Sequence, residues 1–220
     1  MNTKSHKSAD LYIGYVGYFI LVMKMELMNR KIRPSIYIVL IALFAAIPVG
    51  IRIAFIMTGL SVIVQWTNII GVFTFIGAIF LGPVAGIFIG FTGFLLSDVI
   101  SPWGVSPYTI LMGGTMAAIG FISGLTISYE DEMLFFEKVI LIVKLYILMF
   151  IYDAITSIVG YLLWGLTLND AIFYGIVGLF IPLYGGYLWL VGPITEATTS
   201  IITTILLDPI RRVFRETGVY

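Results

Sequence analysis

The sequence predicts an all-α integral membrane protein with six transmembrane helices and with both termini in the cytoplasm. Three observations indicate this: an apolar composition, long stretches without charge, and basic residues gathered at the ends of the hydrophobic region. Of the 220 residues, 60% are hydrophobic and only 11% are charged. A soluble globular protein is about 45–50% apolar and about 25% charged. This chain therefore has too few polar side chains to cover its surface in water.

The composition also excludes several function classes. The 12 Lys and Arg residues are balanced by 12 Asp and Glu residues, so the chain has no basic excess with which to bind nucleic acid. It contains no Cys and a single His, His6, which lies in a polar N-terminal segment. We therefore expect no thiol nucleophile, no disulfide framework and no Cys or His metal site, and we predict no cofactor.

Six apolar stretches are candidates for spanning helices, which need roughly 20 residues to cross a hydrocarbon core of about 30 Å. One stretch, Ile53–Ser97, has no charge at all, and as a single helix it would be about twice as long as the bilayer core is thick. It must fold back, and Leu81-Gly82-Pro83 supplies the break. The predicted spans are Ser35–Phe55, Gln65–Leu81, Val84–Asp98, Tyr108–Ser128, Val139–Trp164 and Tyr187–Leu207.

Two further apolar segments are too short to span a bilayer. Ala171–Leu183 is expected to be a re-entrant or interfacial helix. Leu11–Met23 leaves two interpretations of the N-terminal region open: an interfacial helix, or an extension upstream of a true start at Met23, Met25 or Met28. The predicted organisation is an N-terminal extension at 1–33, a six-helix membrane domain at 34–210 and a cytoplasmic tail at 211–220.

Basic residues near the span ends predict the orientation, because Lys and Arg concentrate on the cytoplasmic side of membrane proteins. A basic group precedes the first span and another follows the last, so both termini are expected inside, in a multi-pass protein of the cell membrane. The two groups are Lys24, Arg30, Lys31 and Arg33, and Arg211, Arg212 and Arg215.

Small residues recur at helical spacing within the spans, which lets membrane helices approach closely. Gly82, Gly86 and Gly90 are spaced by four residues, as are Gly120 and Gly124. For these glycines we favour packing within the chain. Ala42 and Ala46 repeat the spacing in the first span.

Three of these stretches, in their order, resemble motifs of the S components of energy-coupling factor (ECF) transporters, small membrane proteins that capture vitamins and related micronutrients. They are the alanine stretch Ala42-Leu43-Phe44-Ala45-Ala46, the Gly-Pro-initiated helix start from Leu81 to Gly90, and the loop from Asp98 to Gly104. The resemblance covers roughly Pro34 to Pro209.

The resemblance implies a substrate-capturing subunit that binds a transmembrane coupling subunit driven by two cytoplasmic ATPases. Ala42 and Ala46 would form the docking face. The chain contains no Gly-x-x-x-x-Gly-Lys-Ser/Thr phosphate loop, so any ATP hydrolysis requires these partners. The related cobalt and nickel capture subunits use an N-terminal histidine arrangement that His6 does not reproduce, and we predict no metal site.

Ionisable residues inside spans are expensive and usually face a cavity or a partner. Asp153, Ser157, Tyr161 and Trp164 recur at spacings of four, four and three, so they share one helix face. A second polar stripe includes Trp189 and Glu196. The two stripes are expected to face each other around an outward cavity. The predicted substrate-binding residues are Asp98, Trp103, Tyr108, Asp153, Ser157, Tyr161, Trp164, Trp189 and Glu196.

Structural roles compete with binding at several of these positions. Trp189 fits an interfacial aromatic belt as well as a binding wall, and Arg52 is available to pair with Asp153 or Glu196. Acidic residues outnumber basic ones in the outer half, which predicts a cationic or amine-bearing substrate. A proton- or cation-coupled carrier or channel is the alternative function. A membrane enzyme is less favoured, because the spans contain no His, no Cys and no Asp-x-x-Asp pair.

Overall fold

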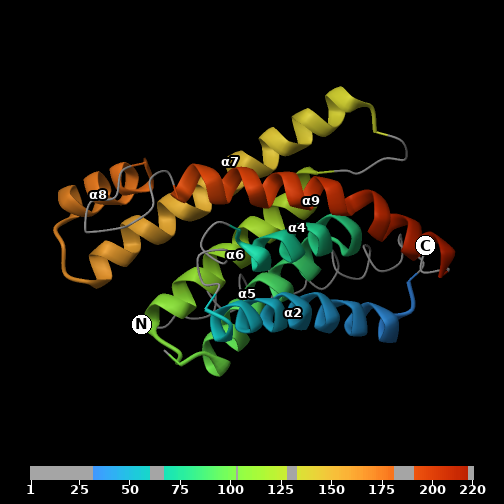
Figure 1. Cartoon of the computed structure of the whole chain (residues 1–220), viewed down its shortest axis with the longest axis horizontal. Helices are drawn as coiled ribbons and strands as arrows, with labels where there is room; N and C mark the ends of the chain where they lie inside the picture. The colour runs from blue at the N-terminus through green and yellow to red at the C-terminus, as the bar shows by residue number, and fades with distance from the viewer. Residues whose placement is uncertain (1–31, 60–66, 103, 128–132, 181–190, 218–220) are drawn as a thin grey trace, which may run out of the picture.

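The structure is a computed structural model that describes residues 32–59, 67–102, 104–127, 133–180 and 191–217. Within these ranges the chain is all-helical, with seven helices and no strand (Figure 1). The helices are α2 (Pro34–Met57), α4 (Ile69–Leu81), α5 (Pro83–Ile100), α6 (Pro107–Thr126), α7 (Phe135–Leu163), α8 (Leu168–Phe180) and α9 (Val191–Glu216).

Four of these helices, α2, α5, α6 and α7, are long and apolar enough to cross a membrane. The all-helical, membrane-type class predicted from the sequence is therefore confirmed. Two of the expected spans differ from the expectation: α4 has only 13 residues, and α9 has 26 residues but is rich in Thr and charged groups. The count of six spans and the orientation of the termini stay predictions.

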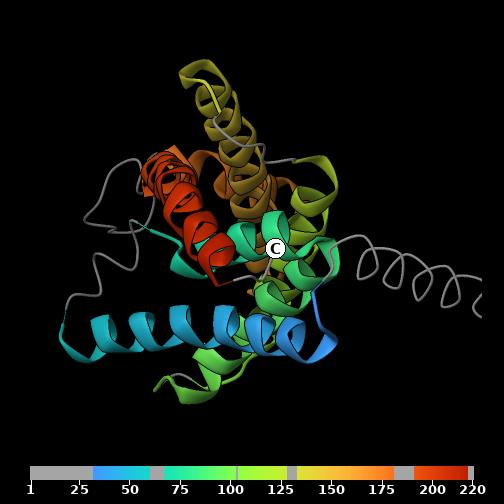
Figure 2. The same cartoon turned by 90° about the vertical axis from the view of Figure 1, so that its right-hand side faces the viewer.

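α4 lies at the centre of the bundle, which accounts for its composition. It contacts α2, α5, α6 and α9, and nearly all of its side chains are buried. α2 lies on one side of it and α7 and α9 lie on the other (Figures 1 and 2). A helix that is apolar all round is expected in such a core position. Phe75 and Ile76 of α4 pack there with Met116 and Leu145, and all four are fully buried.

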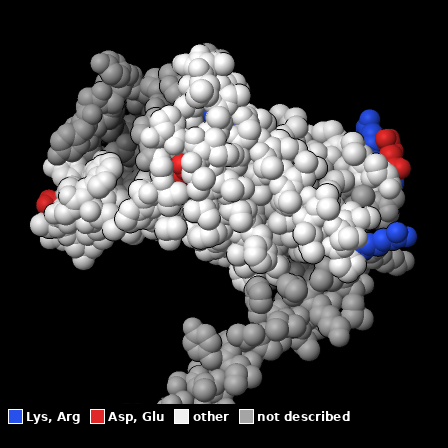
Figure 3. Space-filling view, turned by 90° about the horizontal axis from the view of Figure 1, so that it is seen from below, with Lys and Arg blue, Asp and Glu red and all other residues white. Residues whose placement is uncertain are grey.

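The helices bring their termini to two opposite ends of the bundle. The start of α2, the start of α7 and the end of α9 lie at one end (Figure 1). Charged side chains gather at that end of the face in Figure 3, beside a broad uncharged surface. Large apolar side chains are exposed along the helices between the ends, among them Val39 of α2 and Val143 of α7. An apolar surface of this extent is typical of contact with lipid.

The predicted break between the second and third spans is confirmed. Gly82 ends α4 with a φ of 99°, a region that glycine adopts without steric cost, and its N–H still bonds to the carbonyl of Ala78. Pro83 then occupies the first position of α5, where its missing N–H leaves no hydrogen bond unmade.

Glycines bring the backbones of α5 and α6 into direct contact. A Cβ placed on Gly86 would lie 2.6 Å from the carbonyl carbon of Gly120, and one on Gly124 would lie 2.6 Å from the backbone of Pro83. We call these residues, with Gly90, the glycine seam. The favoured interpretation of the glycine spacing as packing within the chain is confirmed here.

Most described helix boundaries lie within three residues of the expected ones, and three differ by more. α4 begins at Ile69 rather than Gln65, and α7 begins at Phe135 rather than Val139. α9 continues to Glu216 with Pro209 inside it, so most of the predicted tail at 211–220 is helical. The predictions for residues 1–31, for Trp103 and for Trp189 lie outside the described residues.

The glycine seam leads to a first prediction. Gly86→Ala should lower the free energy of unfolding by about 1–3 kcal/mol, because the new Cβ meets backbone that cannot move aside. Gly114→Ala is the control, since a Cβ there meets nothing within 4 Å; it should be neutral or slightly stabilising. Unfolding of the full chain in mixed detergent and SDS micelles measures both. Equal stability of the two variants would contradict the seam.

Candidate functional site

A cavity of about 440 Å³ lies near the end of the bundle opposite the C-terminal end of α9. Residues from all seven described helices, or from the turns beside them, line it. They are Arg52, Thr67, Asn68, Ile69, Ile70, Phe94, Tyr108, Met112, Tyr152, Asp153, Thr156, Ser157, Gly178, Leu179, Gly192 and Thr195. Its volume lies within the range of about 300–1,000 Å³ typical of small-molecule sites.

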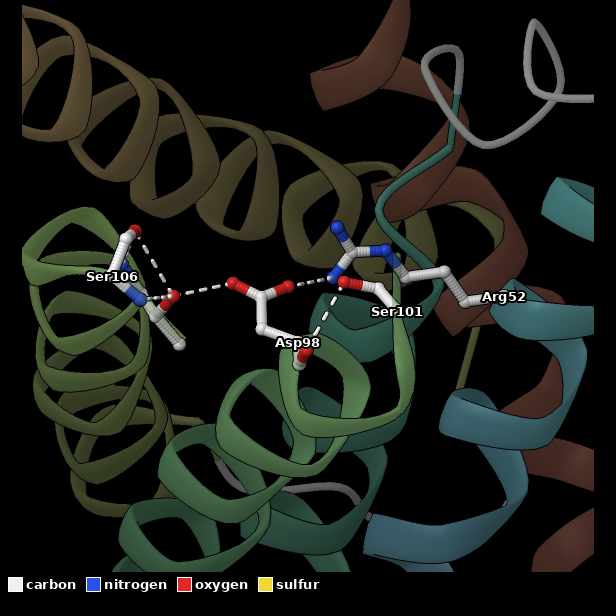
Figure 4. A network of polar contacts seen from close by, with 5 residues as sticks. Arg52, Asp98, Ser101 and Ser106 are labelled. Atoms are coloured by element: carbon white, nitrogen blue, oxygen red, sulfur yellow. Dashed lines mark hydrogen bonds and ion pairs between the residues drawn. The ribbon is translucent and has the colours of Figure 1, made fainter. Parts of the chain in front are cut away.

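Arg52 reaches the cavity from α2 and belongs to a polar network (Figure 4). Its Nη1 lies 3.7 Å from Oδ1 of Asp98 on α5, while the other carboxylate oxygen of Asp98 accepts a hydrogen bond from the Thr109 hydroxyl on α6. Thr109 also forms the capping box of α6 with Ser106. Arg52 therefore pairs with Asp98, and in the described part of the chain it forms no ion pair with Asp153 or Glu196, the structural alternative that the sequence left open.

Aromatic rings form the wall next to Arg52. The guanidinium carbon lies 5.7 Å from the centre of the Phe94 ring, a distance at which a cation–π interaction forms. Phe94 in turn stacks on Tyr152 of α7, with ring centres 6.0 Å apart and planes 27° apart. Tyr108 fits against Gly160, where a Cβ would lie 2.9 Å from its ring.

Asp153 and Glu196 are buried carboxylates without hydrogen bonds. Oδ2 of Asp153 and both carboxylate oxygens of Glu196 are buried and have no partner at hydrogen-bonding distance and geometry. Glu196 is fully buried between α9 and α7, with Tyr146 as its polar neighbour. The two carboxylates lie close enough to repel each other when both are charged. Asp153 lines the cavity and Glu196 lies behind its wall.

Asn68 fixes the start of α4 at the cavity edge. Its side chain accepts a hydrogen bond from the N–H of Gly71 at 2.9 Å, which is an N-cap, and its own N–H donates to the Thr199 hydroxyl of α9 at 3.1 Å. The hydroxyl of Thr156 is bonded to the carbonyl of Tyr152 at 2.9 Å on its own helix. The bond from Asn68 to Thr199 joins the start of α4 to α9 beside the cavity.

The predicted binding residues fall into three groups. Tyr108, Asp153 and Ser157 line the cavity, and Asp98 and Glu196 lie directly behind its lining residues. Tyr161 and Trp164 point elsewhere: they form an edge-to-face pair 5.7 Å apart, Tyr161 contacts Tyr174 of α8, and Trp164 is 73% exposed. Trp103 and Trp189 lie outside the described residues.

Sequence reasoning missed several lining residues. Asn68 had a readable signal, because Thr-Asn before an apolar run is a helix N-terminus signature. Phe94 and Tyr152 had none, since a single aromatic residue in an apolar span is most often part of the core. Arg52 was noted as a possible partner for a carboxylate, and the structure adds its position on the cavity wall.

Among the described residues, no three His, Cys, Asp or Glu side chains gather as metal ligands would. The class that the fold and the cavity define is an all-helical, membrane-type protein with a polar and aromatic cavity near one end. No protein-family model, no curated protein and no solved structure matches the chain.

The ion pair behind the cavity leads to a second prediction. Asp98→Ala should lower the free energy of unfolding by about 3–5 kcal/mol, because it leaves the largely buried Arg52 without its counter-charge. In the double variant Arg52→Met with Asp98→Ala the loss should be smaller than the sum of the single losses by at least about 1 kcal/mol. A double-mutant cycle by SDS unfolding measures this, and strictly additive losses would refute the pairing.

Proposed function

We propose that this chain is the membrane-embedded substrate-binding subunit of an ECF-type ATP-driven importer. In this proposal it captures a vitamin or related micronutrient, cationic or amine-bearing, from outside the cell. It would cross the cell membrane six times with both termini in the cytoplasm. The observation that supports this best is a cavity of about 440 Å³ with polar and aromatic walls, at the end of the bundle away from the basic residues.

The position of the cavity suits capture from outside. The exposed basic residues Arg33, Arg212 and Arg215 lie at the ends of α2 and α9, and basic residues favour the cytoplasmic side. The cavity lies at the other end of these helices, next to the C-terminal part of α7. The lining residues Tyr108 and Asp153 would therefore lie in the outer half of the membrane domain.

The outer face of α2 supports the proposed docking of a coupling subunit. Ala42 and Ala46 are both exposed, and Val39, Leu43 and Ile47 beside them are 62%, 49% and 38% exposed. Small residues flanked by larger apolar ones allow another membrane helix to approach closely. The proposed occupant is the transmembrane coupling subunit, and the cytoplasmic ATPases would supply the phosphate loop that this chain lacks.

One observation favours the alternative of a proton- or cation-coupled carrier. Asp153 and Glu196 are buried, close together and without hydrogen bonds, an arrangement also found in proton relays. The two functions differ in their energy source. A carrier is driven by an ion gradient alone, whereas the capture subunit depends on ATP and on its partners.

Uptake in vesicles is the third prediction and tests the proposed function. The full chain, copurified with its partners and reconstituted into proteoliposomes, should accumulate solute only when ATP reaches the ATPase side. Dissipating proton and sodium gradients with ionophores should leave the rate unchanged. Asp153→Asn should lower uptake at least tenfold, while Asp170→Asn, an exposed carboxylate on α8, should not. Uptake by the purified chain alone under an ion gradient would instead establish the carrier.

The exposed alanines give a fourth prediction. Ala46→Leu should reduce the amount of coupling subunit and ATPase that copurifies with the chain at least tenfold, because the larger side chain separates the helices. Substrate binding by the isolated chain should be unchanged, since Ala46 does not line the cavity. Ala118→Leu on the exposed face of α6 is the matched control. Equal copurification of both variants would place the docking face elsewhere.

A further inference from the structure

One basic and one acidic side chain line the same cavity without pairing with each other. Arg52 enters from α2 and Asp153 from α7, and among the described residues they are the one cationic and the one carboxylate side chain in the lining. The ion pair that Arg52 does form is with Asp98. The cavity wall therefore carries a guanidinium and a carboxyl group on different helices.

Each of these two side chains has a buried polar atom that makes no hydrogen bond. Nη1 of Arg52 and Oδ2 of Asp153 are buried and make no hydrogen bond. Asp98 does not satisfy Arg52 fully, because at 3.7 Å the contact is an ion pair without hydrogen-bond geometry. Buried polar atoms are almost always hydrogen-bonded in folded proteins, so two such atoms on side chains of one cavity wall mark groups whose hydrogen-bonding capacity is left open to a ligand.

Asp98 holds Arg52 in place rather than binding the ligand. One of its oxygens is occupied by the Thr109 hydroxyl, the other faces Arg52, and Asp98 itself is outside the cavity lining (Figure 4). Asp98 is therefore a positioning residue. Asp98 occupies only part of the hydrogen-bonding capacity of the guanidinium, so Arg52 can still bind an anionic group. Arginine binds such groups through its planar fork of N–H donors.

An aromatic surface lies between the two charged groups. The Arg52 guanidinium lies over Phe94, Phe94 stacks on Tyr152, and Tyr152 is next to Asp153 in the chain. A ligand that spans from Arg52 to Asp153 would lie along these two rings. Its middle part is therefore expected to be apolar or aromatic.

We propose that the ligand of this cavity is zwitterionic, with a carboxylate that binds Arg52 and an amine that binds Asp153 across the Phe94–Tyr152 wall. This inference rests on the proposed function and extends it. An amine group alone would supply a partner for Asp153 but none for Arg52. A purely cationic ligand would leave Arg52 unsatisfied and would place a second positive charge in its cavity. A purely anionic ligand would leave the Asp153 carboxyl group without a partner.

Ring-matched probes test this on the purified full chain in detergent, without partners or ATP. The probes are phenylalanine, tyrosine, tryptophan and histidine, each with its decarboxylated amine and its deaminated acid, and binding is followed by thermal unfolding and equilibrium dialysis. At least one zwitterion should bind at least tenfold more tightly than both of its analogues. Equal binding of an analogue, or no binding by any probe, would overturn the proposal.

Substitutions separate the two ends of the ligand. Arg52→Gln should weaken binding of the zwitterion until its affinity equals that of its amine analogue. Arg52→Lys should restore part of the lost affinity. Asp153→Asn should weaken the zwitterion to the affinity of its acid analogue. Arg33→Gln and Asp170→Asn, both exposed and outside the cavity, are the matched controls. Should Arg52→Gln fail to fold, the preference of the unsubstituted chain among the probes still decides the question.

The outcomes also separate this inference from the proposed function. ATP-dependent uptake of a compound that lacks either the amine or the acid would retain the importer and overturn the zwitterionic ligand. If the chain binds a zwitterion at least tenfold more tightly than its analogues but transports without ATP, the zwitterionic ligand is retained and the ATP-driven importer is overturned.

Discussion

The glycine seam between α5 and α6 is the constraint on which the cavity depends. Backbone contact between Gly86 and Gly120 fixes the register of these two antiparallel helices. Twelve residues separate Gly86 from Asp98 and eleven separate Gly120 from Thr109, so both side chains lie about the same height above the contact at 1.5 Å per residue. Thr109 can therefore bind one oxygen of Asp98, and the other oxygen is left to hold Arg52 at the cavity wall.

The helices were largely readable from the sequence because their limits are set locally. Gly82-Pro83 ends one helix and starts the next through backbone chemistry alone, and uncharged stretches of sufficient length predict apolar helices. The end of α9 could not be predicted from the sequence, because proline usually ends a helix and Pro209 nevertheless lies inside this one. Proline loses one hydrogen bond, and an exposed position such as this one lets water satisfy the carbonyl left free.

The candidate site was readable only in part, because periodicity gives the face of a helix and not the neighbour that meets it. Asp153 and Ser157 reach the cavity as the spacing predicted, whereas Tyr161, one turn further along the same face, meets Tyr174 of α8 instead. The partner of Arg52 could not be predicted for the same reason: the register of α5 and α6 brings Asp98 to 3.7 Å from Arg52, and this register follows from glycines far from either residue.

The unpaired buried groups also bear on how binding and docking are related. Each buried polar atom without a partner costs about 1–3 kcal/mol, a large share of the stability of a typical domain, about 5–15 kcal/mol. A ligand that satisfies Arg52 therefore acts on the packing of α2 as well as on affinity. The exposed Ala46 belongs to the same helix, and Pro48, which has no N–H to donate, lies between the two. The proposed ligand contact at Arg52 and the proposed docking face at Ala46 thus lie on either side of Pro48, where the hydrogen bonding of α2 is weakest. A change in helix tilt on one side of Pro48 need not disturb the other side.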